Sequence, residues 1–289
     1  MRGAYSSLGT AVAIEVRGLQ KAYGDFVAVG NVDLSVQVGE IFAILGPNGA
    51  GKTTTVEILE GYRTRDAGTV RVLGVDPAEA DAAWHTQVGI VLQTSGFNDE
   101  LTVLEHVRHF AGFYRSPRDP VELIAAVGLT EKADARARSL SGGQQRRLDV
   151  ALGVVGRPEL LFLDEPTTGF DPEARRQFWQ LIRGLRDEGT TIVLTTHYLD
   201  EAEALADRLA VLVAGEVVEV ATPATLGGRA DAAAIVQWSE HGETKRVTTD
   251  NPTQAVVDLA GRLGGEVPDL RVSRPSLEDV YLRMVGAAR

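Results

Sequence analysis

The residues best suited to chemistry lie in a glycine-rich loop that follows an apolar run. The run Ile41–Leu45 is followed by GPNGAGKT over Gly46–Thr53, which fits the spacing G-x-x-x-x-G-K-[ST] between a strand and a helix. Its glycines let backbone N–H groups surround a phosphate, and the positive end of the following helix attracts the same anion. Lys52 supplies a charge for the β- and γ-phosphates, and the Thr53 hydroxyl is a ligand for Mg²⁺.

The alternative for this loop is a glycine-rich segment that only turns the chain, but the strand-to-helix context favours phosphate binding. We therefore predict that the chain binds a nucleoside triphosphate. The predicted contacts come from nine consecutive residues: Gly46, Pro47, Asn48, Gly49, Ala50, Gly51, Lys52, Thr53 and Thr54.

Two adjacent carboxylates follow a second apolar run, in LLFLDEP. Asp164 ends a predicted buried strand, where a carboxylate is costly unless it serves a cation, so we expect it to be a magnesium ligand. Glu165 could accept a proton from the attacking water or orient it. The alternative for Glu165 is a helix cap or an exposed surface carboxylate.

A third segment, SLSGGQQRRLDVAL, begins at Ser139 and places two glycines at the start of a predicted helix. Ser141 and Gln144 have the spacing of a capping box. Gly142 and Gly143 offer bare backbone N–H groups beside a positive helix end, which together can bind an anion. On local evidence alone, a capped helix with a tolerated glycine pair is at least as good an interpretation.

The elements that must position these residues alternate between strands and helices, which favours an α/β layered core. Alternating or continuous apolar patterns predict strands at Ala13–Leu19, Val32–Val38, Ile41–Leu45, Leu160–Leu163 and Thr191–Leu194. Residues 101–155 have a mostly helical pattern, which predicts a helical insertion between core strands. A turn-rich segment after Ala221 leads to a small α+β domain, with strands at Ala234–Glu240 and Thr244–Thr249, a helix from Pro252, a short strand near Leu270 and a final helix opened by Ser276.

Composition excludes several classes of protein. The chain has 289 residues and a net charge of −11, so we expect no general nucleic-acid surface. It has no cysteine, which excludes disulfides and thiolate metal sites. No apolar stretch is long enough to span a bilayer, and the first dozen residues lack the apolar core of a secretory signal. We expect a cytoplasmic protein that acts on a membrane only through a partner.

The order of these segments, GPNGAGKTT, LSGGQ, LLFLDEP and TTH, resembles that of the ATP-binding cassette superfamily, specifically the ATPase subunits of transporters. The resemblance covers nearly the whole chain. It implies that Gln93 is the Q-loop glutamine and a magnesium ligand, that His197 is the switch histidine, and that Tyr23 stacks on adenine. The alternative for Tyr23 is an aromatic residue packed at the end of a strand. Gly169–Pro172 is similar to the D-loop, with Phe170 where the family usually has Leu. Catalytic roles are thereby implied for Glu165, His197, Lys52 and Gln93, and magnesium ligation for Thr53, Gln93 and Asp164.

The resemblance also implies an architecture. Residues 1–221 would form the ATP-binding cassette, a P-loop NTPase core with a mixed sheet and a helical subdomain at about 95–155, and residues 222–289 an accessory domain. In the family, two cassettes face head to tail, and the signature of one closes over the ATP of the other. Ser141, Gly142, Gly143 and Gln144 would thus bind nucleotide held by a second subunit, which implies an ATP-dependent homodimer.

The tail RPSLEDVYLRMVG, from Arg274 to Gly286, is similar to that of bacterial drug and polysaccharide efflux subunits of the daunorubicin type. This implies an ATPase on the inner face of the cell membrane that powers a separate permease and exports a drug-like or lipid-like compound. Two alternatives stay open at this stage. One is a soluble cassette ATPase that drives a cytosolic machine, and the other is a non-catalytic regulatory module.

Two further groups of polar residues carry no motif. The arginines at 136, 138, 146 and 147 are expected to form a solvated helix face, and the alternative is that they help to attract the anionic nucleotide. The histidines at 85, 106, 109 and 241 have no metal-like spacing and are expected to be surface or packing residues.

Overall fold

The computed structural model describes residues 11–92, 96 and 100–287. The chain divides into two compact units, of which the first ends at Val220 and the second begins at Ala221. Each unit is described by itself.

The first unit is built on a nine-stranded mixed sheet with the strand order β4-β1-β2-β9-β8-β3-β7-β6-β5. Strands β1, β2 and β4 pair in antiparallel fashion, whereas β3 is parallel to β7 and β8, and β6 is parallel to β5 and β7. The bounds are β1 Val12–Tyr23, β2 Phe26–Gln37, β3 Ile41–Leu45, β4 Ala67–Val72, β5 Val88–Val91, β6 Leu160–Asp164, β7 Thr191–Thr196, β8 Arg208–Val213 and β9 Glu216–Ala221. The predicted α/β fold with a mixed sheet is confirmed.

The buried strands are those with continuous apolar sequences. Every residue of β3 and of β7 is buried, and in β6 only the final Asp164 is partly exposed. Strands that are covered on both faces need apolar side chains on both, which explains why these runs do not alternate. These strands end at the same edge of the sheet because they are parallel. The segments that contain the predicted nucleotide-binding and catalytic residues follow them.

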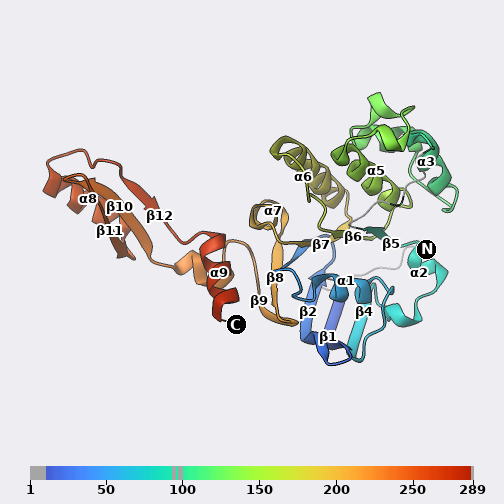
Figure 1. Ribbon diagram of the computed structural model, residues 1–289, viewed down its shortest axis with the longest axis horizontal. Coiled ribbons are helices and arrows are strands. Elements are labelled where there is room, and N and C mark those ends of the chain that lie inside the picture. Colours follow the sequence, from blue (N-terminus) through green and yellow to red (C-terminus); the bar gives the residue numbers. More distant parts are fainter. Residues whose placement is uncertain (1–10, 93–95, 97–99, 288–289) are drawn as a thin grey trace. The chain divides into compact units, whose positions relative to one another are not determined.

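Helices cover the sheet and form a separate group beside it (Figure 1). Helix α1 packs against β2, β4 and β7, and α7 packs against β3 and β7. Helices α3, α4 and α5 pack on one another, and α5 also contacts β5. The bounds are α1 Lys52–Leu59, α2 Ala82–His85, α3 Val103–Ala111, α4 Pro120–Ala126, α5 Gly142–Val154, α6 Pro172–Asp187 and α7 Leu199–Leu205, with short 3₁₀ turns at Pro77–Glu79, Thr130–Lys132 and Ala137–Ser139.

The second unit is a three-stranded sheet with two helices, as the sequence predicted. Its strand order is β11-β10-β12, and Val236 and Trp238 of β10 pack against Leu259 of α8. Ser276 caps the final helix, since the Asp279 backbone N–H donates to the Ser276 hydroxyl at 3.1 Å. The bounds are β10 Ala234–Glu240, β11 Glu243–Thr249, α8 Pro252–Leu263, β12 Arg271–Ser273, α9 Leu277–Ala287 and a 3₁₀ segment at Leu226–Asp231.

Two features of the first unit differ from expectation. Strands β1 and β2 extend toward each other and form a tight hairpin in which Tyr23 pairs with Phe26 across Gly24, which has a φ of 59°. Strands β4, β5, β8 and β9 were not predicted. Among the described residues, no helix has both the length and the apolar character needed to cross a membrane.

Candidate nucleotide-binding and hydrolysis site

The glycine-rich loop joins β3 to α1 and can adopt its path only with glycine at two positions. A Cβ atom on Gly46 would lie 2.3 Å from the Leu212 carbonyl oxygen, and one on Gly51 would lie 2.2 Å from that of Ala28. Gly51 also has a φ of 96°, in the left-handed region that glycine adopts without strain. The loop is therefore pressed against two neighbouring strands, and its backbone is left bare on the side where a phosphate would bind.

Lys52 is held inside this loop. Its Nζ donates to the carbonyl oxygens of Gly46 at 2.9 Å and Pro47 at 3.2 Å, and only 5% of the residue is exposed. Burial lowers the pKa of Lys52, while the nearby Glu165 carboxylate opposes that shift. A cation with so little water around it gains from an added anion, because the anion replaces the lost hydration.

A row of residues crosses the carboxyl ends of three parallel strands. Ile44 of β3 pairs with Thr195 of β7, and Thr195 pairs with Asp164 of β6. The Thr195 hydroxyl donates to Asp164 Oδ1 and accepts from the Glu165 backbone N–H at 3.0 Å. Glu165 has a φ of 43°, which is uncommon for a residue with a side chain. Thr195 thus fixes the turn that takes the chain from Asp164 to Glu165.

The Glu165 carboxylate lies between two nitrogen-bearing side chains. Its Oε1 lies 3.6 Å from Lys52 Nζ and 3.2 Å from His197 Nδ1. The three side chains come from the ends of different segments: His197 follows β7, Glu165 follows β6, and Lys52 opens α1. Three of the four predicted catalytic residues therefore meet. The fourth, Gln93, lies outside the described residues.

A cleft of about 370 Å³ lies over this cluster. It is lined by Phe26, Ala28, Asn48, Gly49, Gly51, Lys52, Thr53, Thr54 and Glu165. Most of the predicted phosphate contacts are on this list. Tyr23 is not, and its ring instead lies 5.3 Å from the Arg63 guanidinium and 5.6 Å from Lys21 Nζ. Phe26, which the sequence did not single out, is the aromatic residue that lines the cleft.

The oxygen donors at this site suit magnesium. Thr53 lines the cleft, and the Asp164 carboxylate ends the neighbouring strand β6. A hydroxyl and a carboxylate are hard oxygen ligands, and Mg²⁺ is usually held by one or two such groups together with water and phosphate oxygens. Within the described residues, no group of three or more His, Asp or Glu side chains could enclose a metal by itself. Such an open pair of ligands fits an ion that arrives with a nucleotide.

The glycine pair begins helix α5, as predicted. The Gln144 backbone N–H donates to Ser141 Oγ at 3.3 Å, and the Ser141 backbone N–H donates to Gln144 Oε1 at 3.0 Å, which completes the capping box. A Cβ atom on Gly142 would meet no described atom within 4 Å. Of the described residues that line the cleft, none comes from Ser141–Gln144. Within this chain, the capped helix start therefore does not line the site that holds Lys52.

One sequence expectation was wrong. Arg146 does not belong to a solvated face, because only 6% of it is exposed and its guanidinium donates to three backbone carbonyl oxygens. Arg136 and Arg138 are exposed and form ion pairs with Glu100 at 2.8 Å and 2.7 Å. A further buried titratable group was missed, since Glu60, which follows the last residue of α1, is 5% exposed.

Comparison with known proteins identifies the family. A family model described as ABC transporter matches residues 29–168. The Nod factor export ATP-binding protein I of Rhizobium sp. (strain N33) is 39% identical, with 95% of this chain and 97% of that protein covered. This chain belongs to the ABC transporter family. The daunorubicin/doxorubicin resistance ATP-binding protein DrrA of Streptomyces peucetius is 35% identical, with 95% of this chain and 92% of that protein covered.

Solved cassettes of ABC transporters share the fold. A dimeric, post-hydrolysis cassette bound to ADP and phosphate is 27% identical with a TM-score of 0.65, covering 72% of this chain and 98% of that chain. An ATP-binding subunit of an ABC transporter gives 26% identity and a TM-score of 0.67, covering 74% of this chain and 91% of that one. Together with the cluster around Glu165, this shows that the chain is an ATP-binding and ATP-hydrolysing subunit of an ABC transporter. A non-catalytic module is excluded.

Proposed function

We propose that the chain works as an ATP-dependent homodimer on the inner face of a membrane and powers a separate permease that exports an amphipathic, drug-like or lipid-like compound. Residues 1–221 would be the cassette, with a helical subdomain at about 95–155, and residues 222–289 an accessory domain. The relatives named for Nod factor export and daunorubicin resistance support export, and they suggest the class of compound.

The separation of two predicted nucleotide-binding segments carries the dimer proposal. Lys52, Thr53 and Glu165 line one cleft, whereas the described lining of that cleft contains nothing from Ser141–Gln144. The capped start of α5 has the bare backbone donors of an anion site but is not among the described residues that line the cleft of its own chain. A second copy placed head to tail would supply that anion, and the dimeric cassette with ADP and phosphate offers a precedent.

The chemistry we propose is attack of water on the γ-phosphorus. The water oxygen forms a bond to phosphorus as the bond to the β–γ bridging oxygen breaks, and the proton of the water passes to Glu165, whose Oε1 faces the cleft from between Lys52 and His197. Lys52 and His197 stabilise negative charge on the γ-phosphate. Thr53, Asp164 and Gln93 would hold Mg²⁺, which neutralises charge on the β- and γ-oxygens.

Purification of the chain from its native membranes in mild detergent, as the Glu165→Gln variant with ATP, tests the proposal. We expect a polytopic membrane protein to co-purify in a complex of two cassettes with two copies or two halves of a permease. Lys52→Ala serves as the matched control, because it removes the charge that binds the phosphates. Recovery of soluble partners alone would overturn the transport proposal in favour of a cytosolic machine.

A further inference from the structure

A single buried arginine joins the signature helix to the segments around the catalytic glutamate. Arg146 of α5 donates from Nε to the Pro166 carbonyl oxygen at 3.1 Å and from Nη2 to that of Asp164 at 2.7 Å. Its Nη1 donates to the Leu92 carbonyl oxygen. All three nitrogens of the guanidinium are therefore engaged, each with a different carbonyl group.

The three carbonyl groups that accept from Arg146 lie next to Glu165 and Gln93 in the chain. Asp164 and Pro166 are the two chain neighbours of Glu165, so the guanidinium holds the backbone on both sides of the catalytic carboxylate. Leu92 follows β5 and immediately precedes Gln93. One side chain thus fixes the turn that aims Glu165 and the point at which the chain leaves β5.

The cost of this arrangement argues against an incidental contact. Burial lowers the pKa of Arg146, which means that keeping a cation here costs stability, and the Asp149 carboxylate lies 3.8 Å from its guanidinium. A buried charge is tolerated when its donors are satisfied, and the flat guanidinium satisfies several acceptors at once. A leucine or methionine would fill the space without that cost, so packing alone does not explain the residue.

The same helix carries the predicted contact with the second subunit. Ser141 caps α5, and Arg146 lies five residues further on, or roughly 7 Å along the helix axis at 1.5 Å per residue. The far part of α5 is pressed against β5, because a Cβ atom on Gly89 would lie 2.3 Å from the Gly153 carbonyl oxygen. A displacement of the start of α5 would therefore be transmitted through the hydrogen bonds of Arg146 to the Glu165 turn.

We propose that Arg146 is a positioning residue that couples the two ATP sites of the dimer. When the start of α5 engages the nucleotide of the partner subunit, Arg146 moves with the helix and adjusts the Glu165 turn of its own subunit. Both sites of the dimer then become able to hydrolyse ATP at the same time. This inference rests on the proposed homodimer.

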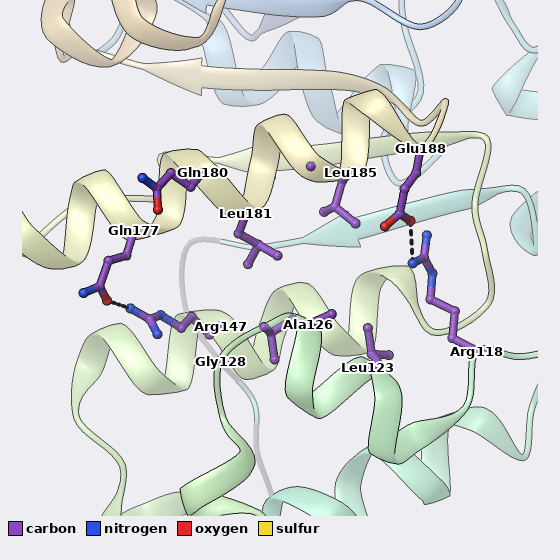
Figure 2. Close-up of a pocket in the computed structure, with 12 residues that line it drawn as sticks. Arg118, Leu123, Ala126, Gly128, Arg147, Gln177, Gln180, Leu181, Leu185 and Glu188 are labelled. Carbon is purple, nitrogen blue, oxygen red and sulfur yellow. Dashed lines mark hydrogen bonds and ion pairs between the residues drawn. The ribbon is translucent and has the colours of Figure 1, made fainter.

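Arg147 provides a matched comparison in the next position of the same helix. Figure 2 shows its side chain directed toward Gln177 of α6, to which its Nη2 donates. It lines a groove of about 400 Å³ between α4 and α6. Arg147 therefore has the same charge and lies on the same helix, but the hydrogen bond described for it goes to α6 and not to the backbone around Glu165.

The test compares Arg146→Lys, Arg146→Gln and Arg147→Gln with the wild-type chain. Steady-state ATP hydrolysis is measured over a range of ATP concentrations, and the affinity of the monomer for a fluorescent ATP analogue is measured separately. For the wild type and for Arg147→Gln we expect sigmoidal kinetics with a Hill coefficient clearly above 1. Its upper limit is about 2, because the dimer has two coupled sites. For both Arg146 variants we expect a coefficient near 1, a kcat reduced about tenfold or more, and an affinity within about twofold of wild type.

Arg146→Lys should fail to restore coupling, because a single ammonium cannot bridge three diverging carbonyls. Wild-type cooperativity and turnover in Arg146→Lys would overturn the inference. Failure of both Arg146 variants to fold at 25 °C would also overturn it, since the residue would then be structural. If the wild type itself shows neither cooperativity nor an ATP-dependent dimer, the proposed homodimer fails rather than the role of Arg146.

Discussion

The backbone N–H of Glu165 donates to the hydroxyl of Thr195 at 3.0 Å, and the same hydroxyl donates to the Asp164 carboxylate. A single threonine on a fully buried strand therefore orients both acidic residues of the site. A valine has almost the same shape but neither donates nor accepts, so the contribution of this hydroxyl can be measured in isolation.

Thr195→Val should lower kcat by about tenfold to a hundredfold while the fold is kept, because the Glu165 turn loses one of its anchors. ATP turnover and thermal unfolding of the purified protein check this. Thr191→Val is the control, since Thr191 lies at the other end of β7, where its hydroxyl accepts from the Gly39 backbone N–H at 3.0 Å. Both variants should lose similar stability. Equal turnover in both would contradict the assigned role of Thr195.

The Gly142→Asp variant tests anion binding at the start of α5 without disturbing the fold. An acidic residue in the first turn of a helix is favoured by the helix dipole, and a Cβ atom at this position meets no described neighbour within 4 Å, so the fold should be kept. A carboxylate there would repel the γ-phosphate of a second subunit. We expect unchanged ATP affinity of the monomer but at least about tenfold slower hydrolysis.

The control for that variant is Gly184→Asp on the exposed side of α6, which also has open space around its Cβ position. It adds the same charge to the chain without touching a predicted phosphate contact. Hydrolysis in Gly184→Asp should match the wild type. If Gly142→Asp also hydrolyses ATP at the wild-type rate, the start of α5 is not a nucleotide contact.

Glu60 makes stability depend on pH. Burial raises the pKa of its carboxyl to about 8, with smaller contributions from the charges of Asp164 and Glu57. Because the folded-state pKa lies above the unfolded value near 4.5, the contribution of Glu60 is fully present below pH 4.5 and is lost as pH rises toward 8. Glu60→Gln does not titrate and should escape that loss.

The free energy of unfolding of Glu60→Gln, relative to wild type, should therefore rise by about 2–3 kcal/mol between pH 5.5 and pH 8.5. Urea unfolding at the two pH values measures it. A constant difference for Glu60→Gln would mean that its carboxyl titrates normally in the folded protein.

Much of the site could be predicted because its chemistry is local in the sequence. The loop Gly46–Thr53, the strand that ends at Asp164 and the Ser141 capping box each depend on neighbours within a few residues, and the structure forms the capping box as expected. Continuous apolar runs likewise indicated the buried parallel strands. Patterns of this kind identify elements and the loops that follow them.

Contacts between distant segments were not predictable in the same way. Arg146 looked like part of a polar helix face because its sequence neighbours are polar, yet its acceptors lie 18, 20 and 54 residues away. Thr195 belongs to the TTH segment, but only His197 of that segment was singled out, and the role of Thr195 arises from a register that places it beside Asp164. The strand extension to Tyr23 and Phe26 was missed because the alternating pattern fades before the hairpin.

The mass of Glu165→Gln in solution, with and without Mg²⁺ and ATP, tests the central claim most directly, because the proposed mechanism needs two chains to complete one site. The chain has a mass of 30.9 kDa. We predict a monomer without nucleotide and a stable species of twice that mass with ATP, which Lys52→Ala or Gly142→Asp should prevent. A Glu165→Gln chain that binds ATP and stays at 30.9 kDa would contradict the account.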